Sequence, residues 1–217
     1  MKILNGISVV ALLLAGAATP SFATLLTPGG IVTPGTVSGG ATILADTGLV
    51  NFSFGGDTGK VEEIVTNNFS ASPYAGGITF LYDIQVTGGH IVNLTSESFN
   101  IPGITIDVAQ DDLRLTTAFP TGPYTPAVNA SLTSDGTTLG FSFGDPDGLT
   151  AGETSYTLVV NTNLTNYEAG MFSLQDGQTG NFTGFVPAAT PEPGSLALLG
   201  TGLVGLAGAA RRRLFRK

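Results

Sequence analysis

Acidic residues in glycine-rich turns are the side chains of this sequence best suited to chemistry. Asp145 and Asp147 lie in the segment GDPDG, Asp57 lies in GGDTG, and Asp111 and Asp112 are adjacent. Calcium takes carboxylate and carbonyl oxygens from loops as ligands. Asp145 and Asp147 are therefore candidate calcium ligands. No segment has the spacing of a known calcium loop, and solvated turn aspartates explain the pattern equally well.

The patterns that resemble catalytic motifs do not predict an enzyme. The segment GFSFG (140–144) matches a nucleophile elbow, but its phenylalanines and serine alternate as in a strand. The sole histidine, His90, precedes that serine, so the order serine, acid, histidine is not met. His90 lies in the segment TGGHIVN at a turn-to-strand junction, where a histidine is usually solvent-facing or locally hydrogen-bonded. One histidine without cysteine excludes the usual zinc ligand sets.

A second apparent motif, GTGLVG (200–205), matches the dinucleotide fingerprint by its letters alone. It lies inside an apolar stretch near the end of the chain, without a surrounding βαβ unit. We therefore predict no catalytic residues, no cofactor and no cofactor-binding residues, and no metal ligands beyond the two calcium candidates. A pair of glycosidase carboxylates would have to face each other across a cleft, which a sequence does not reveal.

The charge of the central part of the chain excludes one class of partner. Between residues 24 and 190 the only cations are Lys60 and Arg114, against 15 of the 16 acidic residues. Binding to nucleic acid or to anionic lipid requires clustered Lys and Arg. The sequence therefore predicts no nucleic-acid partner.

Alternation of apolar and polar residues dominates residues 41–190. Short runs rich in Val, Ile, Thr, Phe and Tyr are separated by clusters of Gly, Asp, Asn and Pro. We expect an all-β domain, an antiparallel β-sandwich of jelly-roll or immunoglobulin-like type. Residues 24–40 are rich in Pro and Gly and are expected to form a linker or a loose edge strand. The predicted strands are VNFSF, ITFLYDIQV, HIVNLTSESF, ITIDVAQ, LRLTTAF, AVNASLTS, LGFSF, YTLVVNTNL, MFSLQDG and FTGFVP.

The two ends of the chain have the features of export signals. Residues 1–23 combine Lys2, an apolar run over 7–18 and the small residues Ser21 and Ala23, as in a secretory signal peptide cleaved after Ala23. Near the C-terminus, residues 194–210 are expected to form a transmembrane helix. Its fifteen uncharged residues 196–210 extend about 22 Å as a helix, against a hydrocarbon core of about 30 Å, so the span is short. A basic cluster holds the tail in the cytoplasm and leaves the domain outside: Arg211, Arg212, Arg213, Arg216 and Lys217.

Residues 191–217 resemble the PEP-CTERM sorting signal of envelope-exporting bacteria. The resemblance rests on the tripeptide Pro191, Glu192 and Pro193, followed by an apolar helix and a basic end in that order. It implies that the tripeptide is recognised by exosortase, a membrane enzyme that releases or transfers the protein upstream. Proteins with this signal have unrelated bodies, and many are associated with extracellular matrix and exopolysaccharide. The resemblance therefore implies a processing route and no activity.

Together these features predict an exported protein of the bacterial envelope or extracellular matrix. Its precursor would be tethered to the inner membrane and its mature form would lie at the cell surface or outside the cell. We expect a structural or binding role and not an enzyme. The alternative is a carbohydrate-binding module that holds exopolysaccharide on aromatic platforms, for which the chain offers Tyr74, Tyr82, Tyr124, Tyr156 and Tyr167.

Overall fold

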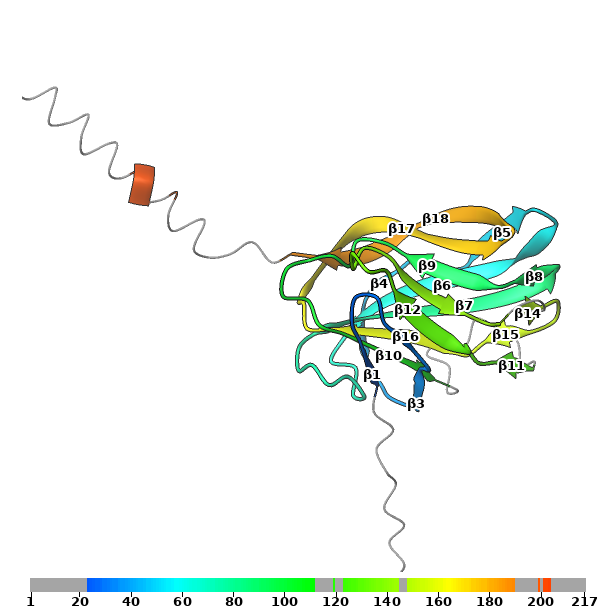
Figure 1. The fold of residues 1–217 in the computed structure, drawn as a ribbon, viewed down its shortest axis with the longest axis horizontal. Coiled ribbons are helices and arrows are strands. Elements are labelled where there is room, and N and C mark those ends of the chain that lie inside the picture. Colours follow the sequence, from blue (N-terminus) through cyan, green and yellow to red (C-terminus); the bar gives the residue numbers. More distant parts are fainter. Residues whose placement is uncertain are drawn as a thin grey trace, which may run out of the picture.

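The computed structural model describes residues 23–111, 119, 123–144, 148–189, 199 and 201–203. These residues form eighteen strands, most of them paired antiparallel, in three sheets (Figure 1). Within the described ranges only Leu199 and residues 201–203 are helical. The structure thus confirms the all-β prediction and is consistent with a β-sandwich.

The larger sheet is built around the long strand β7 (Ile78–Gly88). Its neighbours are β6 (Asp57–Asn67) and β16 (Thr157–Thr162), and β10 (Ile106–Asp111) follows β16. The pairs β3–β10 and β11–β15 are parallel, which the prediction of antiparallel strands did not include. The shorter members are β1 (Thr24–Leu26), β3 (Gly35–Val37), β4 (Thr42–Asp46), β5 (Val50–Phe54), β11 (Tyr124–Thr125) and β15 (Thr154–Ser155).

The smaller sheet has six strands, and its longest pair is a hairpin that ends the domain. The hairpin consists of β17 (Asn166–Asp176) and β18 (Gln178–Ala188), joined at Gly177, whose φ of 63° favours glycine. The other members are β9 (Asn93–Ser96), β13 (Leu139–Ser142), β12 (Asn129–Leu132) and β2 (Ile31–Val32). A separate two-stranded sheet pairs β8 (His90–Ile91) with β14 (Leu149–Thr150).

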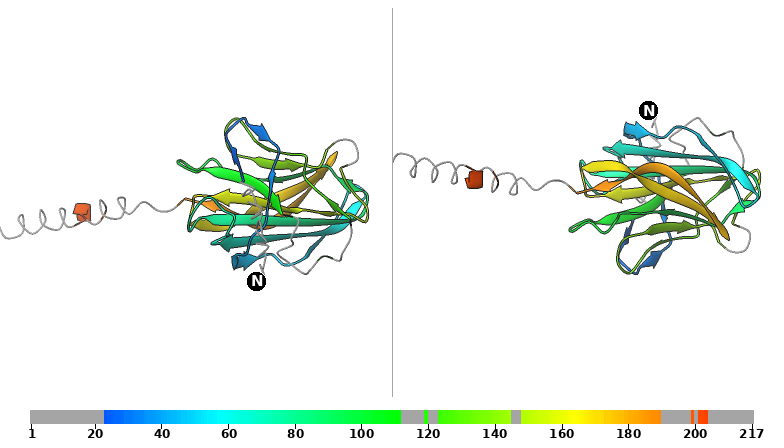
Figure 2. Two further views of the ribbon diagram at one scale, coloured as in Figure 1. Left: turned by 90° about the horizontal axis from the view of Figure 1, so that it is seen from below. Right: turned by 90° about the horizontal axis from the view of Figure 1, so that it is seen from above.

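The main core lies between the inner faces of the two larger sheets, whose long strands run side by side (Figure 2). From the ten-stranded sheet Phe80 and Tyr82 point inward, and from the six-stranded sheet Leu94 and Phe172 do so. The rings of Tyr82 and Phe172 meet edge to face with centroids 5.7 Å apart. Neither sheet could bury its apolar face without the other.

The outer face of the larger sheet is also covered, which explains its nearly continuous apolar strands. Ile64, Leu81 and Val159 belong to a second buried cluster with Val37 and Phe69, which come from β3 and the segment after β6. A strand buried on both faces loses its alternation. The strands of segment 24–40 pair at the edges of both sheets: β1 and β3 with β10 in the larger sheet, and β2 with β12 in the smaller one.

Strand β6 lies outside every run that the sequence predicted. Its segment DTGKVEEIVTN begins with turn-forming residues and has two adjacent glutamates at its centre. Nevertheless Glu62 and Glu63 are only 5% and 0% exposed, because both faces of the larger sheet are covered here.

We expect Phe172→Ala to lower the free energy of unfolding by about 3–5 kcal/mol, since the residue is 1% exposed and contacts Tyr82 in the main core. Met171→Ala is the matched control on the same strand. Its side chain is 50% exposed, so its effect should stay within about 0.5 kcal/mol. Urea unfolding of the full-length chain, followed by far-UV circular dichroism, makes the comparison. Equal losses in both variants would contradict the shared core.

Candidate functional site

Several residues that the sequence predicted to be functional lie outside the described residues. They are the calcium candidates Asp145 and Asp147, the tripeptide Pro191, Glu192 and Pro193, and the basic cluster Arg211, Arg212, Arg213, Arg216 and Lys217. Residues 1–22 of the predicted signal peptide also lie outside them. Across the described part of the chain, no helix has both the length and the apolar character needed to cross a membrane.

The tyrosines proposed as carbohydrate platforms are at least partly buried. Tyr82 is 0% exposed in the main core, so it offers no surface to a ligand. Tyr74 donates a hydrogen bond to the carboxylate of Asp107, and burial together with this anion raises its pKa above the usual value. Tyr167 packs edge to face on Phe185, with ring centroids 5.6 Å apart. Carbohydrate binding by these residues stays a prediction.

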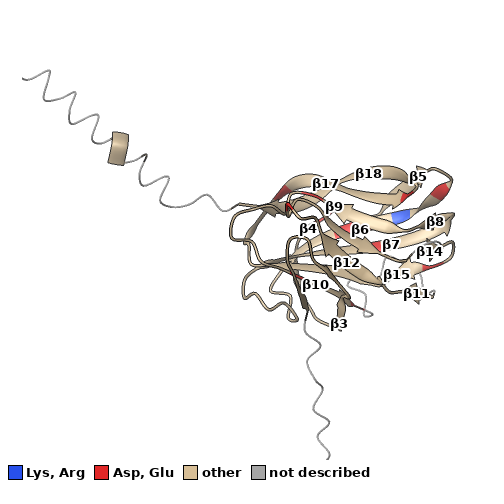
Figure 3. Cartoon of the chain, viewed as in Figure 1, with Lys and Arg blue, Asp and Glu red and all other residues tan. Residues whose placement is uncertain are grey.

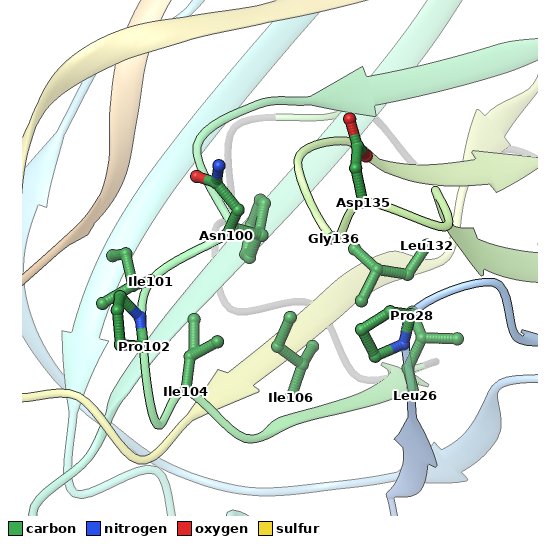
Figure 4. Close-up of a pocket in the computed structure, with 11 residues that line it drawn as sticks. Leu26, Pro28, Asn100, Ile101, Pro102, Ile104, Ile106, Leu132, Asp135 and Gly136 are labelled. Carbon is green, nitrogen blue, oxygen red and sulfur yellow. The ribbon is translucent and has the colours of Figure 1, made fainter.

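An apolar pocket of about 250 Å³ opens between β1, the segment after β9 and the β12–β13 turn (Figure 4). Apolar side chains such as Leu26, Ile104 and Leu132 form its wall, and Asn100 and Asp135 supply polar groups. Asp135 accepts hydrogen bonds from the Thr133 hydroxyl and from the amide and hydroxyl of Thr137. These bonds lower its pKa to about 2. Its carboxylate thus holds the turn together.

Glu63 is a buried carboxyl group that connects the two sheets. It lies on β6, and its Oε2 accepts a hydrogen bond of 2.8 Å from the Phe185 amide on β18. Burial raises its pKa to about 8, although the bonds from Phe185 and from the Tyr82 hydroxyl oppose this shift. A strongly shifted pKa can mark a functional site. Since Glu63 is 0% exposed, its role here is to hold β18 on the core.

The described residues contain one cluster that combines an imidazole with carboxylates: Asp57, His90 and Asp176. His90 Nε2 lies 2.9 Å from Asp176 Oδ1, and the His90 amide donates to Asp57 Oδ1 at 3.1 Å. Each residue offers one ligand atom, and these atoms lie within 4.8 Å of one another. Asp57 is 3% exposed, and the His90 and Asp176 side chains are 39% and 21% exposed.

Each member of the cluster stands at the end of a strand. Asp57 begins β6, His90 begins β8 and Asp176 ends β17, so the three sheets each contribute one residue. The sequence singled out Asp57 as an acidic turn residue and His90 as a solvent-facing or locally hydrogen-bonded residue. It did not single out Asp176. The only local signal at Asp176 is an Asp-Gly turn between two alternating segments. Its pairing with His90 depends on the tertiary structure, so the sequence does not reveal it.

Residues 189–213 match the family model of the PEP-CTERM protein-sorting motif. The match includes the tripeptide 191–193, the apolar segment and the first three arginines of the basic cluster. The described residues 23–189 thus form an all-β domain, and the segment that follows this domain matches a sorting signal. The chain has a PEP-CTERM motif, which supports export and membrane-associated sorting with exosortase as the processing enzyme. Comparison with curated proteins and with solved structures gave no match.

The raised pKa of Glu63 makes stability depend on pH. Its pKa is about 8 in the folded protein and about 4.5 when exposed, so the folded state binds the extra proton between these values. Stability therefore falls as pH rises from about 4.5 to 8, by up to about 1.4 kcal/mol per pH unit. Glu63→Gln keeps an acceptor for the Phe185 amide and removes the ionisation.

We expect the E63Q variant to be more stable than the wild type at pH 8, with the difference shrinking toward pH 5. Urea unfolding at several pH values measures this difference. Glu168→Gln, at an exposed glutamate of β17, serves as the control and should follow the wild-type profile. Parallel profiles for E63Q and the wild type would show that the carboxyl group is not protonated in the fold.

Proposed function

We propose that the protein is an exported component of the bacterial envelope or extracellular matrix with a non-catalytic structural or binding role. A signal peptide over residues 1–23 directs export, and the PEP-CTERM segment tethers the precursor to the inner membrane until exosortase processes it. The mature domain then lies at the cell surface or outside the cell. A β-sandwich domain fits this role, and its jelly-roll or immunoglobulin-like type stays a prediction.

The observation that supports this proposal most directly is the junction between the domain and the motif. Strand β18 ends at Ala188, and the match to the sorting motif begins at residue 189. Processing near the tripeptide 191–193 would therefore remove no strand of the described domain. Exosortase could release the upstream domain with both sheets intact.

The residue types of the motif suit recognition by a membrane enzyme. Pro191 and Pro193 have no backbone amide hydrogen, and the residue before a proline is disfavoured in helical conformation. The two prolines therefore favour an extended conformation for Glu192, directly before the apolar span. The arginines and lysine after that span favour the cytoplasmic side, which puts Glu192 on the outer side.

The charge of the domain supports release from the membrane surface. Among the residues that the structure describes, Lys60 is the only Lys or Arg, whereas acidic residues occur in both large sheets (Figure 3). Anionic lipid attracts basic clusters, so it offers this domain no electrostatic attraction. Exopolysaccharide as the partner of the mature protein stays a prediction, since no observation on the described tyrosines favours it.

Replacement of Pro191, Glu192 and Pro193 by alanines should prevent processing in the bacterium that makes the protein. We expect the wild-type domain to lack the residues after the motif when its mass is measured, and to leave the inner membrane. The triple variant should keep its C-terminal residues and remain in the membrane fraction. Glu97→Ala, at an exposed glutamate of the domain, is the control and should be processed normally. The proposal would be refuted if the triple variant lost its C-terminal residues and left the inner membrane as the wild type does.

A further inference from the structure

The cluster of Asp57, His90 and Asp176 has the composition and spacing of a metal site. Imidazole and carboxylate are both common ligands of divalent transition metals. At metal–ligand distances of about 2.1 Å, neighbouring ligand atoms lie roughly 3.0–3.4 Å apart. The separation of 2.9 Å between His90 Nε2 and Asp176 Oδ1 is close to this value. All three candidate ligand atoms lie within 4.8 Å of one another, so they face a common point where one ion could be shared.

A second observation concerns the carboxylate of Asp57. Its Oδ1 accepts the His90 amide, while its Oδ2 is buried and has no hydrogen-bond partner among the described residues. The residue is 3% exposed, so bulk water has little access to this oxygen. A buried polar atom without a partner costs about 1–3 kcal/mol, and more when it is charged. A bound cation would satisfy this oxygen.

The backbone around the cluster brings the three turns close together. Gly89 has a φ of 72°, and a Cβ at this position would overlap Asp57 Oδ1, so the turn approaches the carboxylate closely because it has no side chain there. The pairing of β6 with β7 shifts register between Thr58 and Gly59, directly after Asp57. The Val92 amide donates to the Gln175 carbonyl at 2.9 Å, which fixes the His90 segment beside the end of β17.

We propose that Asp57, His90 and Asp176 bind a divalent transition-metal cation, with Zn²⁺ as the reference ion. His90 Nε2 and one carboxylate oxygen from each aspartate are the protein ligands, and water completes the coordination. Calcium and magnesium prefer oxygen ligands throughout, so the imidazole favours zinc over both. The partly exposed His90 and Asp176 leave the site open to ions from solution.

The bound ion connects the two large sheets at one end of the domain. Asp57 belongs to the ten-stranded sheet and Asp176 to the six-stranded sheet. In Figure 1 the labels β5 and β8 mark this end on the right, and β18 runs from it to the opposite end, where the sorting motif begins. An ion that binds only the folded state stabilises it. Zinc should therefore raise the melting temperature.

Titration calorimetry of the full-length chain with ZnCl₂ tests the proposal. The protein is made without a histidine tag and freed of metal with EDTA. We expect about one zinc ion per chain, and binding at least about 10-fold weaker in His90→Gln and in Asp176→Asn. Asp46→Asn, at the exposed last residue of β4, is the matched control and should bind zinc like the wild type. No stoichiometric binding by the wild type, or equal binding by all variants, overturns the proposal.

A thermal unfolding experiment gives an independent readout and checks that the variants fold. Zinc should raise the melting temperature of the wild type and of D46N, and it should raise that of H90Q and D176N by clearly less. Equal concentrations of CaCl₂ and MgCl₂ should have no effect. A shift caused by calcium and not by zinc would overturn the assignment to a transition metal. Variants that melt cooperatively without zinc confirm that lost binding reflects lost ligands.

Discussion

The packing of two sheets on one apolar core is the constraint on which the rest of this structure depends. Tyr82 and Phe172 meet across the interface, and neither sheet buries its inner face alone. This contact also determines where the strand ends lie. Glu63 accepts a hydrogen bond from the Phe185 amide of β18, which it can reach only because the sheets are stacked. Burial in the same interface raises the pKa of Glu63 to about 8.

The sequence predicted those parts of the fold that alternation of residue types can show. The run ITFLYDIQV corresponds to β7 and the run YTLVVNTNL contains β16. The sequence did not predict β6, because Glu62 and Glu63 interrupt the apolar pattern and glutamates in general favour exposed positions. Burial on both faces of the larger sheet overrides that preference. Residues 24–40 were expected to form a linker or a loose edge strand, but the separate strands β1, β2 and β3 were not predicted, since two or three residues give no period.

The sorting motif and the proposed metal site differ in how far the sequence alone can reveal them. The sorting motif is a continuous segment of residues, and its tripeptide, apolar span and basic end are therefore recognisable without a structure. The Asp57–His90–Asp176 cluster combines three segments that are distant in the chain. The acidic turn at Asp57 was visible locally, but Asp176 joins it only through the stacking of the sheets. A single histidine without cysteine argued against the usual zinc sets and gave no hint of mixed carboxylate ligands.

Both sheets should open together, because they share one core. Hydrogen exchange of the full-length chain, measured by mass spectrometry, tests this most directly. The slowest amides of β7 and β16 in the larger sheet and of β13 and β17 in the smaller sheet should report opening free energies that agree within about 1 kcal/mol. If the amides of the smaller sheet exchanged with an opening free energy several kcal/mol lower, the two sheets would not form one cooperative core.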